Sequence, residues 1–197
     1  WGNPSDQIDE ALHLEVDGSP ITGLPETLAF KAGAFAAVAD NLSLDGAGES
    51  FVVVRDKQGK VLCRTNPIRA IEDPDRKSLV HFWGDTHGQS NETLGTNDAR
   101  EYFLFGRDRA FLDVMGHQGN DFQITGTFWK GLNALSAELD RPGNFVCIPG
   151  YEWSANTAVG GDRNVHYRSE GETIHRSSHA QIADPGDMVD EEEDAHT

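Results

Sequence analysis

Leu79-Val-His-Phe-Trp-Gly84 is an apolar, strand-like run that leads directly into the polar cluster Asp85-Thr-His87. The same arrangement recurs twice further along the chain, before His117-Gln-Gly-Asn-Asp121 and before Tyr151-Glu-Trp153. Residues that carry chemistry on α/β folds collect at the C-terminal ends of strands, where loops meet and backbone groups are left unpaired. Carboxylates and imidazoles are also ligands that divalent metals take in proteins. The sequence therefore predicts a metal-dependent hydrolase.

Strands and helices are expected to alternate from residue 79 onward. A first helix follows a cap at Thr96 or Asn97, and a second helix has leucines at helical spacing and ends at Arg141-Pro-Gly143. Further strands are expected over residues 111–116, 144–149 and 163–168. This α/β pattern favours a parallel sheet or an incomplete β/α barrel over residues 73–183, because four strands are too few to close a barrel.

The flanking segments have different patterns. Residues 1–72 predict a small all-β, sandwich-like module, with strand-like runs at Leu12–Gly18 and Ser50–Asp56 and turn residues between the runs. The alanine-rich stretch Leu28–Ala39 also permits a short helix. Residues 184–197 begin with an acidic block and predict a solvated linker or a disordered tail.

The charge balance limits the class of partner. The 197 residues contain 33 Asp and Glu against 16 Lys and Arg, which gives a formal net charge of −17. Nucleic acid and anionic membrane are therefore not expected as partners, because phosphate groups are held by Lys and Arg. The acidity suits either a soluble protein that concentrates divalent cations or solubility alone.

Neither a membrane span nor a secretory leader is visible in the sequence. No run of 18 apolar residues occurs, and the start of the chain lacks a basic segment followed by an apolar one. These features predict a soluble cytoplasmic or periplasmic protein, and a cleaved leader is compatible with them.

The two cysteines, Cys63 and Cys147, are too few for a disulfide framework. Cys147 lies in the apolar run Phe145-Val-Cys-Ile148, which favours packing as a small apolar side chain over a role as a thiol nucleophile.

Asp85-Thr-His87 is the sharpest of the polar clusters. Alternate residues of an extended segment point to one side, so Asp85 and His87 can face the same metal, and Gln89 continues the alternation. The alternative is an exposed turn with a capping aspartate.

The loop His117–Asp121 offers a second set of polar side chains. His117 is a good nitrogen ligand, while Asn120 and Asp121 can coordinate a metal or orient an imidazole. The alternative is a helix-entry loop with local hydrogen bonds.

Glu152 stands between two aromatic residues at a strand end. A carboxylate in such surroundings is poorly hydrated, so it should either bind a metal or have a raised pKa, and as a bridging ligand it can hold two cations. The alternative is a surface glutamate between half-buried rings. A glycosidase pair of Asp85 and Glu152 would leave the nearby histidines unexplained.

Two later segments add candidates. Asp162 can be a ligand and Arg163 or Asn164 can hold an anion, whereas His166 belongs either to the site or to the core. The segment His175-Arg-Ser-Ser-His179 suits binding of phosphate, sulfate or carboxylate, or else is a solvated loop.

Taken in order, four motifs resemble the PHP superfamily of metal-dependent phosphoesterases, and most closely a PHP-like branch described as a domain of unknown function. They are Thr65-Asn-Pro67, Gly84-Asp-Thr-His87, Gly150-Tyr-Glu-Trp-Ser154 and Arg163-Asn-Val165. The resemblance covers residues 65 to 182 and implies a distorted TIM-like β/α barrel with two or three metals at the ends of its strands.

The resemblance also implies roles for single positions. His87 matches the first histidine of the family's His-x-His motif, and Glu152 matches its bridging glutamate. The chain departs from the family at Gln89, which replaces the second histidine, and at Asp162, which replaces the histidine before Arg-Asn-Val. Either His117 or Asn120 takes the place of a further family histidine. The family's later motifs are absent, in agreement with an incomplete barrel: either another chain completes the barrel and its site, or part of the site is missing, or the chain is a piece of a longer protein.

Residues and resemblance together predict a hydrolase, most simply a phosphoesterase, that uses metal-activated water on a small anionic substrate. Amide or sulfate ester hydrolysis and a non-catalytic binding module with a degenerate metal site are the alternatives. The expected ligands of one to three Zn²⁺ or Mn²⁺ ions are Asp85, His87, His117, Glu152 and Asp162. The expected catalytic residues are Glu152, His117, Arg163 and His179. The expected substrate-binding residues are Gln89, Asn120, Asn164 and Arg176.

Overall fold

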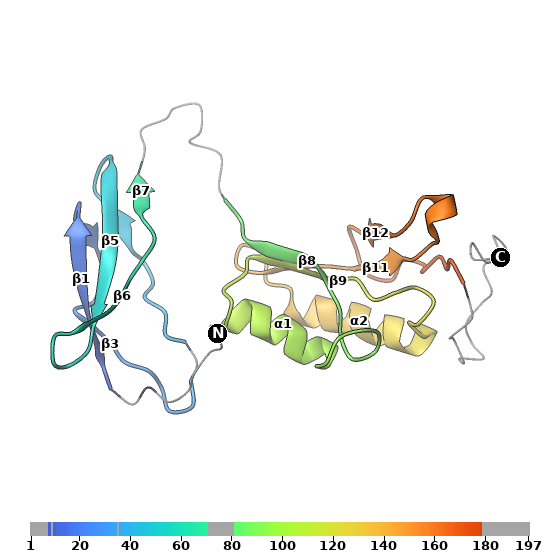
Figure 1. Cartoon of the computed structure of the whole chain (residues 1–197), viewed down its shortest axis with the longest axis horizontal. Coiled ribbons are helices and arrows are strands. Elements are labelled where there is room, and N and C mark those ends of the chain that lie inside the picture. The colour runs from blue at the N-terminus through green and yellow to red at the C-terminus, as the bar shows by residue number, and fades with distance from the viewer. Residues whose placement is uncertain (1–7, 9, 35, 71–80, 179–197) are drawn as a thin grey trace. The chain divides into compact units, whose positions relative to one another are not determined.

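The computed structural model describes residues 8, 10–34, 36–70 and 81–178 (Figure 1). The chain divides into two compact units, Trp1–Val80 and His81–Thr197. The boundaries predicted at residues 72 and 183 fall outside the described ranges, as does the acidic segment 184–197.

The first unit is built on an antiparallel five-stranded sheet. Its strands are β1 (Leu12–Gly18), β3 (Thr27–Leu28), β5 (Gly48–Arg55), β6 (Val61–Arg64) and β7 (Ile68–Ala70). Their order is β3-β1-β5-β6, with β7 also paired to β5. Along β1, Leu12, Leu14 and Val16 are buried or half-buried and alternate with exposed polar residues, so one face of the strand is apolar. The strand predicted over Leu12–Gly18 is confirmed.

The described residues of the first unit form strands and no helix, in two sheets of unequal size. Apart from the five-stranded sheet, they contain only a short pair of strands, β2 (Ile21–Thr22) and β4 (Ser43–Leu44). Nor do the described residues between 28 and 39 form a helix. Cross-strand ion pairs such as Arg55 with Glu15, at 2.7 Å, cover the exposed side of the larger sheet.

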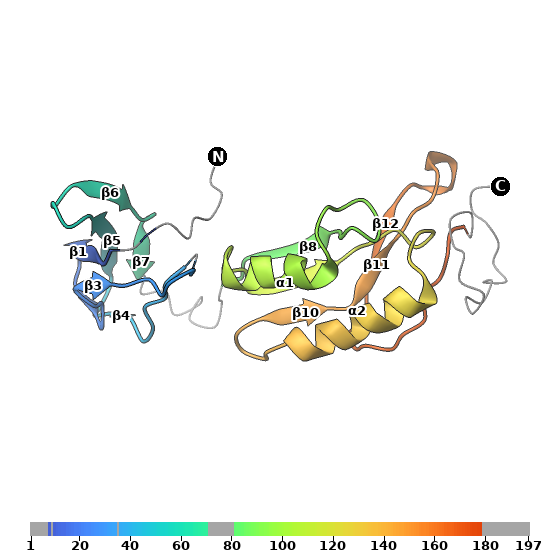
Figure 2. The ribbon, with the colours of Figure 1, turned by 90° about the horizontal axis from the view of Figure 1, so that it is seen from below.

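The second unit begins with a β-α-β-α-β succession. Its elements are β8 (Gly84–Gly88), α1 (Ala99–Asp108), β9 (Val114–His117), α2 (Gly126–Leu139) and β10 (Val146–Ile148). The three strands are parallel, in the order β10-β9-β8. Both helices lie against the same face of this sheet (Figures 1 and 2). The carboxyl ends of the three strands therefore meet at one edge.

The helix ends show why the chain folds as it does here. The N-cap of α1 is Asp98, not the predicted Thr96 or Asn97, and its Oδ1 accepts the Glu101 N–H at 2.7 Å. Thr125 caps α2 by accepting the Phe128 N–H at 3.0 Å. Arg100 on α1 and Glu138 on α2 form a two-pronged ion pair at 2.7 and 2.6 Å, which joins the exposed sides of the helices.

The core lies between the helices and the sheet. Phe103 and Leu132 from the helices pack with Met115 and Cys147 from the strands. A Cβ on Gly106 would lie 1.9 Å from the Met115 sulfur, so this glycine allows α1 to approach β9 closely. Burial raises the pKa of the Cys147 thiol to about 12, which agrees with packing as an apolar side chain rather than with nucleophilic chemistry.

The fourth strand of the predicted barrel does not join the parallel sheet. The last strands, β11 (Gly150–Trp153) and β12 (Arg163–His166), pair antiparallel with each other across a loop that includes the 3₁₀ turn Thr157–Val159. The strand predicted over 163–168 corresponds to β12, and its partner is β11, which comes immediately before it in the chain, so it does not extend the order β10-β9-β8. The predicted PHP-type, TIM-like barrel is therefore wrong: the described residues form small sheets with two short helices, and they close no barrel.

Candidate functional site

Glu152 is brought to the end of the parallel sheet by main-chain hydrogen bonds. Its N–H donates to Gly119 O at 3.0 Å, and its carbonyl accepts the Asp121 N–H at 2.9 Å. β11 therefore runs alongside the loop that follows β9, with Asn120 and Glu152 as bridge partners. Two of the predicted polar clusters are thus adjacent in the fold.

The carboxylate of Glu152 is buried, with only 5% of the residue exposed, and it is surrounded by polar side chains. Its Oε1 accepts from Asn120 Nδ2 at 3.2 Å and from Ser154 Oγ at 3.2 Å. Its Oε2 accepts from Gln89 Nε2 at 3.3 Å and lies 3.4 Å from His87 Nε2. Asn164 belongs to the same group because its side-chain oxygen contacts the His87 ring. We call this group the Glu152 cluster: His87, Gln89, Asn120, Glu152, Ser154 and Asn164.

His87 reaches the cluster from the end of β8. The register of β8 on β9 runs from Asp85 opposite Met115 to Gly88 opposite His117, so β8 carries one extra residue at a bulge. Bulges bend a strand and redirect its side chains. The His87 imidazole is 55% exposed on the solvent side of the cluster, while its two nitrogens contact Glu152 and Asn164.

Asp85 has a different environment from the one that simple alternation predicts. Its Oδ1 accepts the His87 main-chain N–H at 3.1 Å, which is a local turn contact. Burial, followed by the charge of Asp85, raises the pKa of the Tyr102 phenol, which places this carboxylate near Tyr102. The bulge explains why Asp85 and His87 need not share a side.

Gln89 is oriented by a neighbour on its own loop. Its Oε1 accepts the Thr93 hydroxyl at 2.6 Å, which leaves Nε2 to donate to Glu152. Gln89 therefore serves to hold the Glu152 carboxylate in place. The sequence patterns do not predict Thr93 or Ser154 as site residues, although Ser154 follows Glu152 at the spacing that puts both on one side of a strand.

His117 is packed inside the unit and has both ring nitrogens engaged. Nδ1 accepts the Gly119 N–H at 3.2 Å, so Nε2 carries the proton and donates to Ser90 Oγ at 2.8 Å. The ring also lies against Phe128, with 5.6 Å between centroids. Burial lowers the pKa of His117 to about 4. The geometry gives this histidine a packing role, and Asn120 holds the position beside Glu152.

The buried His117 makes the stability of the second unit dependent on pH. The pKa of His117 is about 4 in the folded protein against an ordinary value of 6.5. The contribution of its neutral, buried ring to the free energy of unfolding is therefore fully present above pH 6.5 and is lost as pH falls toward 4. We expect a loss of about 3 kcal/mol in the free energy of unfolding across this window. Urea unfolding at several pH values should show a weaker dependence in His117→Gln. Equal dependence in the two proteins would contradict this role.

Asp121 and Arg176 act as structural ties next to the cluster. Asp121 is fully buried and accepts the Ser154 N–H at 2.7 Å, the Ser177 hydroxyl at 3.0 Å and the Ser177 N–H. Burial raises the pKa of Asp121, while the bonds from Ser154 and Ser177 oppose this. The buried Arg176 donates to the carbonyls of Asp121 and Ile124. Arg176 thus fastens the loop after β9 rather than standing open to a substrate.

The remaining predicted residues within the described ranges lie apart from the cluster. Arg163 pairs across the hairpin with Trp153, and its guanidinium lies 5.2 Å from the Trp153 ring. Side chains alternate along a strand, so these two face away from Glu152 and Asn164. Asp162 is exposed in the turn before β12, and the exposed His166 lies near Gln118. His179 is outside the described residues.

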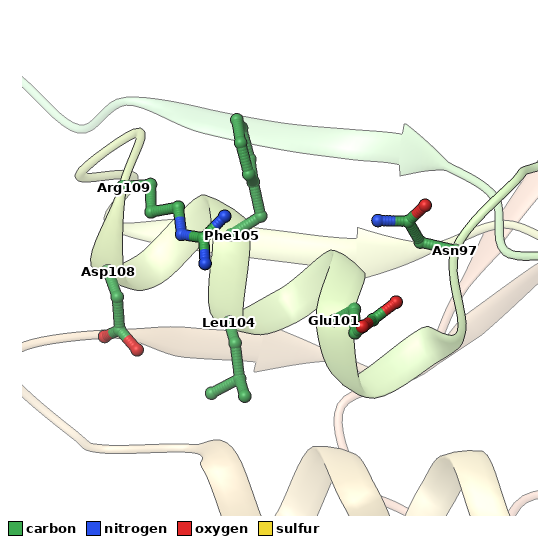
Figure 3. A pocket seen from close by; sticks show the side chains of 6 residues that line it. All are labelled: Asn97, Glu101, Leu104, Phe105, Asp108 and Arg109. Carbon is green, nitrogen blue, oxygen red and sulfur yellow. The ribbon is translucent and has the colours of Figure 1, made fainter. Parts of the chain in front are cut away.

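Two hollows on the second unit lie apart from the cluster. One, of about 350 Å³, runs along α1, where Figure 3 shows Phe105 and Arg109 side by side and Asn97 in the loop before the helix. Another, of about 360 Å³, is lined by residues that include Phe82 and Val146. Neither includes a residue of the Glu152 cluster, whose open side is the exposed ring of His87.

Comparison with known proteins does not assign the chain to a family. Neither the models of known protein families nor the curated proteins gave a match to this chain. Within the described ranges, no three His, Cys, Asp or Glu side chains form a group that could hold a metal. In the same ranges, no helix has the length and apolar character needed to cross a membrane.

Proposed function

We propose that the second unit binds one divalent metal ion at the Glu152 cluster and acts as a metal-dependent hydrolase. The observation that carries the proposal is the buried Glu152 carboxylate, whose Oε2 lies 3.4 Å from His87 Nε2. The hydrogen bonds that this carboxylate accepts come from neutral amide and hydroxyl groups. A buried negative charge is costly unless a cation balances it.

The donor atoms of the cluster suit a divalent cation. His87 Nε2 and Glu152 Oε2 are ligand types used by Zn²⁺ and Mn²⁺, and an amide oxygen is a further ligand for hard cations. The Oδ1 of Asn120 is buried and has no hydrogen-bond partner among the described residues. His87, Glu152 and Asn120 would therefore hold the ion. This set supports a single ion rather than the two or three that the motif resemblance implies.

The chain's own residues would prepare the site. Gln89, Asn120 and Ser154 fix the rotamer of Glu152 by donating to its carboxylate. The exposed side of His87 leaves room for a substrate to approach. When bound, a divalent ion supplies an acidified water and polarises the ester.

What supports a phosphoester as the substrate is the resemblance of the motifs to metal-dependent phosphoesterases. Hydrolysis of an amide bond or of a sulfate ester stays as the alternative. The reason is that Arg163 and Arg176, which the sequence predicts as contacts for the substrate anion, are engaged elsewhere in the unit. A non-catalytic metal-binding module is the second candidate. Of the three proposed donors, only His87 and Glu152 are of the His, Cys, Asp or Glu type, and the third is the amide oxygen of Asn120.

Elemental analysis of the purified full chain tests the proposal. We expect about one equivalent of zinc or manganese, in line with a single three-donor site. The metal should be absent from His87→Ala and retained in His13→Ala, a matched change of an exposed histidine in the first unit.

Hydrolysis is measured next with nitrophenyl phosphate, sulfate and anilide substrates. Activity on the phosphate should disappear with excess EDTA and return with Mn²⁺ or Zn²⁺. Full activity in EDTA would overturn the proposal. Bound metal without turnover of any substrate would favour the binding module.

A further inference from the structure

His87 is held at both ring nitrogens by residues of one hairpin. Its Nδ1 lies 2.9 Å from Asn164 Oδ1, and its Nε2 lies 3.4 Å from Glu152 Oε2. The register of β11 on β12 places Asn164 directly opposite Glu152. The two residues that contact the imidazole are thus cross-strand partners on the same side of the hairpin.

The Asn164 contact determines which nitrogen of His87 carries the proton. A carboxamide oxygen only accepts hydrogen bonds, so Nδ1 must be the protonated nitrogen of the neutral ring. Nε2 then presents a lone pair toward the Glu152 carboxylate oxygen. Two electron-rich atoms at 3.4 Å repel each other unless a cation lies close to both.

We propose that Asn164 is a positioning residue that holds His87 in the Nδ1–H tautomer, with Nε2 free to bind a metal. Resting on the metal site proposed above, this gives Asn164 a role different from the substrate contact that the sequence predicts. Histidine ligands commonly donate their second N–H to an oxygen that sets the tautomer and ring orientation. Asn164 supplies that oxygen from the strand next to Glu152.

Long-range ¹H–¹⁵N NMR of the metal-free full chain tests the tautomer directly. The His87 signals are identified by their loss in His87→Gln, and spectra are recorded at mildly alkaline pH. We expect the Nδ1–H pattern in the natural sequence and in Asn164→Asp, which keeps an acceptor. Asn164→Ala should lose that preference. An Nε2–H pattern in the natural sequence would overturn the proposal, because His87 would then donate to Glu152.

Metal affinity gives the second readout. Titration with Mn²⁺ or Zn²⁺ should show binding weakened about 10- to 100-fold in Asn164→Ala. Asn164→Asp should bind at least as tightly as the natural sequence. Arg168→Ala, an exposed change just past β12, serves as the matched control and should bind normally.

The two proposals fail in different ways. If the natural sequence binds metal and Asn164→Ala binds it equally well, the positioning role is wrong and the metal site stands. If no metal binds although His87 is in the Nδ1–H form, the metal site is wrong. In that case the tautomer difference between Asn164→Ala and Asn164→Asp still decides whether Asn164 positions the ring.

Discussion

Glu152→Gln is expected to remove the bound metal and to lower hydrolysis by roughly a thousandfold or more, since losing a residue that merely orients a ligand already costs about 10- to 100-fold. The substitution keeps the shape of the side chain but removes its charge. It also replaces one acceptor oxygen by an amide nitrogen that faces donors from Gln89, Asn120 or Ser154. The measurements are metal content and steady-state phosphoester hydrolysis.

A fold defect must be separated from loss of the site. Unsatisfied donors around the new amide should destabilise the unit by about 1–3 kcal/mol, less than the roughly 5–15 kcal/mol by which native proteins are stable, so the variant should stay folded at room temperature. Near-ultraviolet circular dichroism and urea unfolding check this. Glu138→Gln is the matched control: it breaks the exposed ion pair with Arg100 and should keep metal and activity. Normal metal content and turnover in Glu152→Gln would contradict the central role of this carboxylate.

The sequence is a good guide where local chemistry decides the structure. β1 follows from strict alternation over Leu12–Gly18, and the β-α-β-α-β order follows from the change to helical spacing after residue 97. The adjacency of His87, Asn120 and Glu152 is also predictable in outline, because they lie near or beyond the carboxyl ends of three neighbouring parallel strands: His87 near the end of β8, Asn120 after β9 and Glu152 after β10.

The features of the fold and of the site that the sequence does not predict depend on contacts between residues far apart in the chain. The bulge between Asp85 and Gly88, which interrupts the simple alternation of side chains there, exists only in the pairing of β8 with β9. A histidine by its type alone suggests a metal ligand. The His117 ring is instead packed against Phe128 and hydrogen-bonded to Ser90, two residues that are distant from it in the sequence. The predicted barrel is wrong because the last predicted strand, seen as β12, turns back on β11 in an antiparallel pair instead of extending the parallel sheet. Arg176 suits an anion site by type, yet it donates to carbonyls more than 50 residues away.

Asp121→Ala is expected to be the most destabilising single change in the second unit, at about 4 kcal/mol, because it leaves several buried donors without an acceptor. The donors are the N–H of Ser154 and both the N–H and hydroxyl of Ser177, which join β11 and the segment after it to the loop after β9. Urea unfolding followed by tryptophan fluorescence reports on this unit, since Trp129 lies in its core.

The matched control for Asp121 is Asp98→Ala. The Asp98 carboxylate accepts one N–H at the exposed start of α1, so its loss should cost about 1 kcal/mol. Asp121→Asn keeps one acceptor oxygen and should fall between the two. If Asp121→Ala were no less stable than Asp98→Ala, the three bonds would not be holding the hairpin to the sheet. Because the loop that contains Asp121 also positions Asn120, Asp121→Ala should weaken metal binding as well, whereas Asp98→Ala should not.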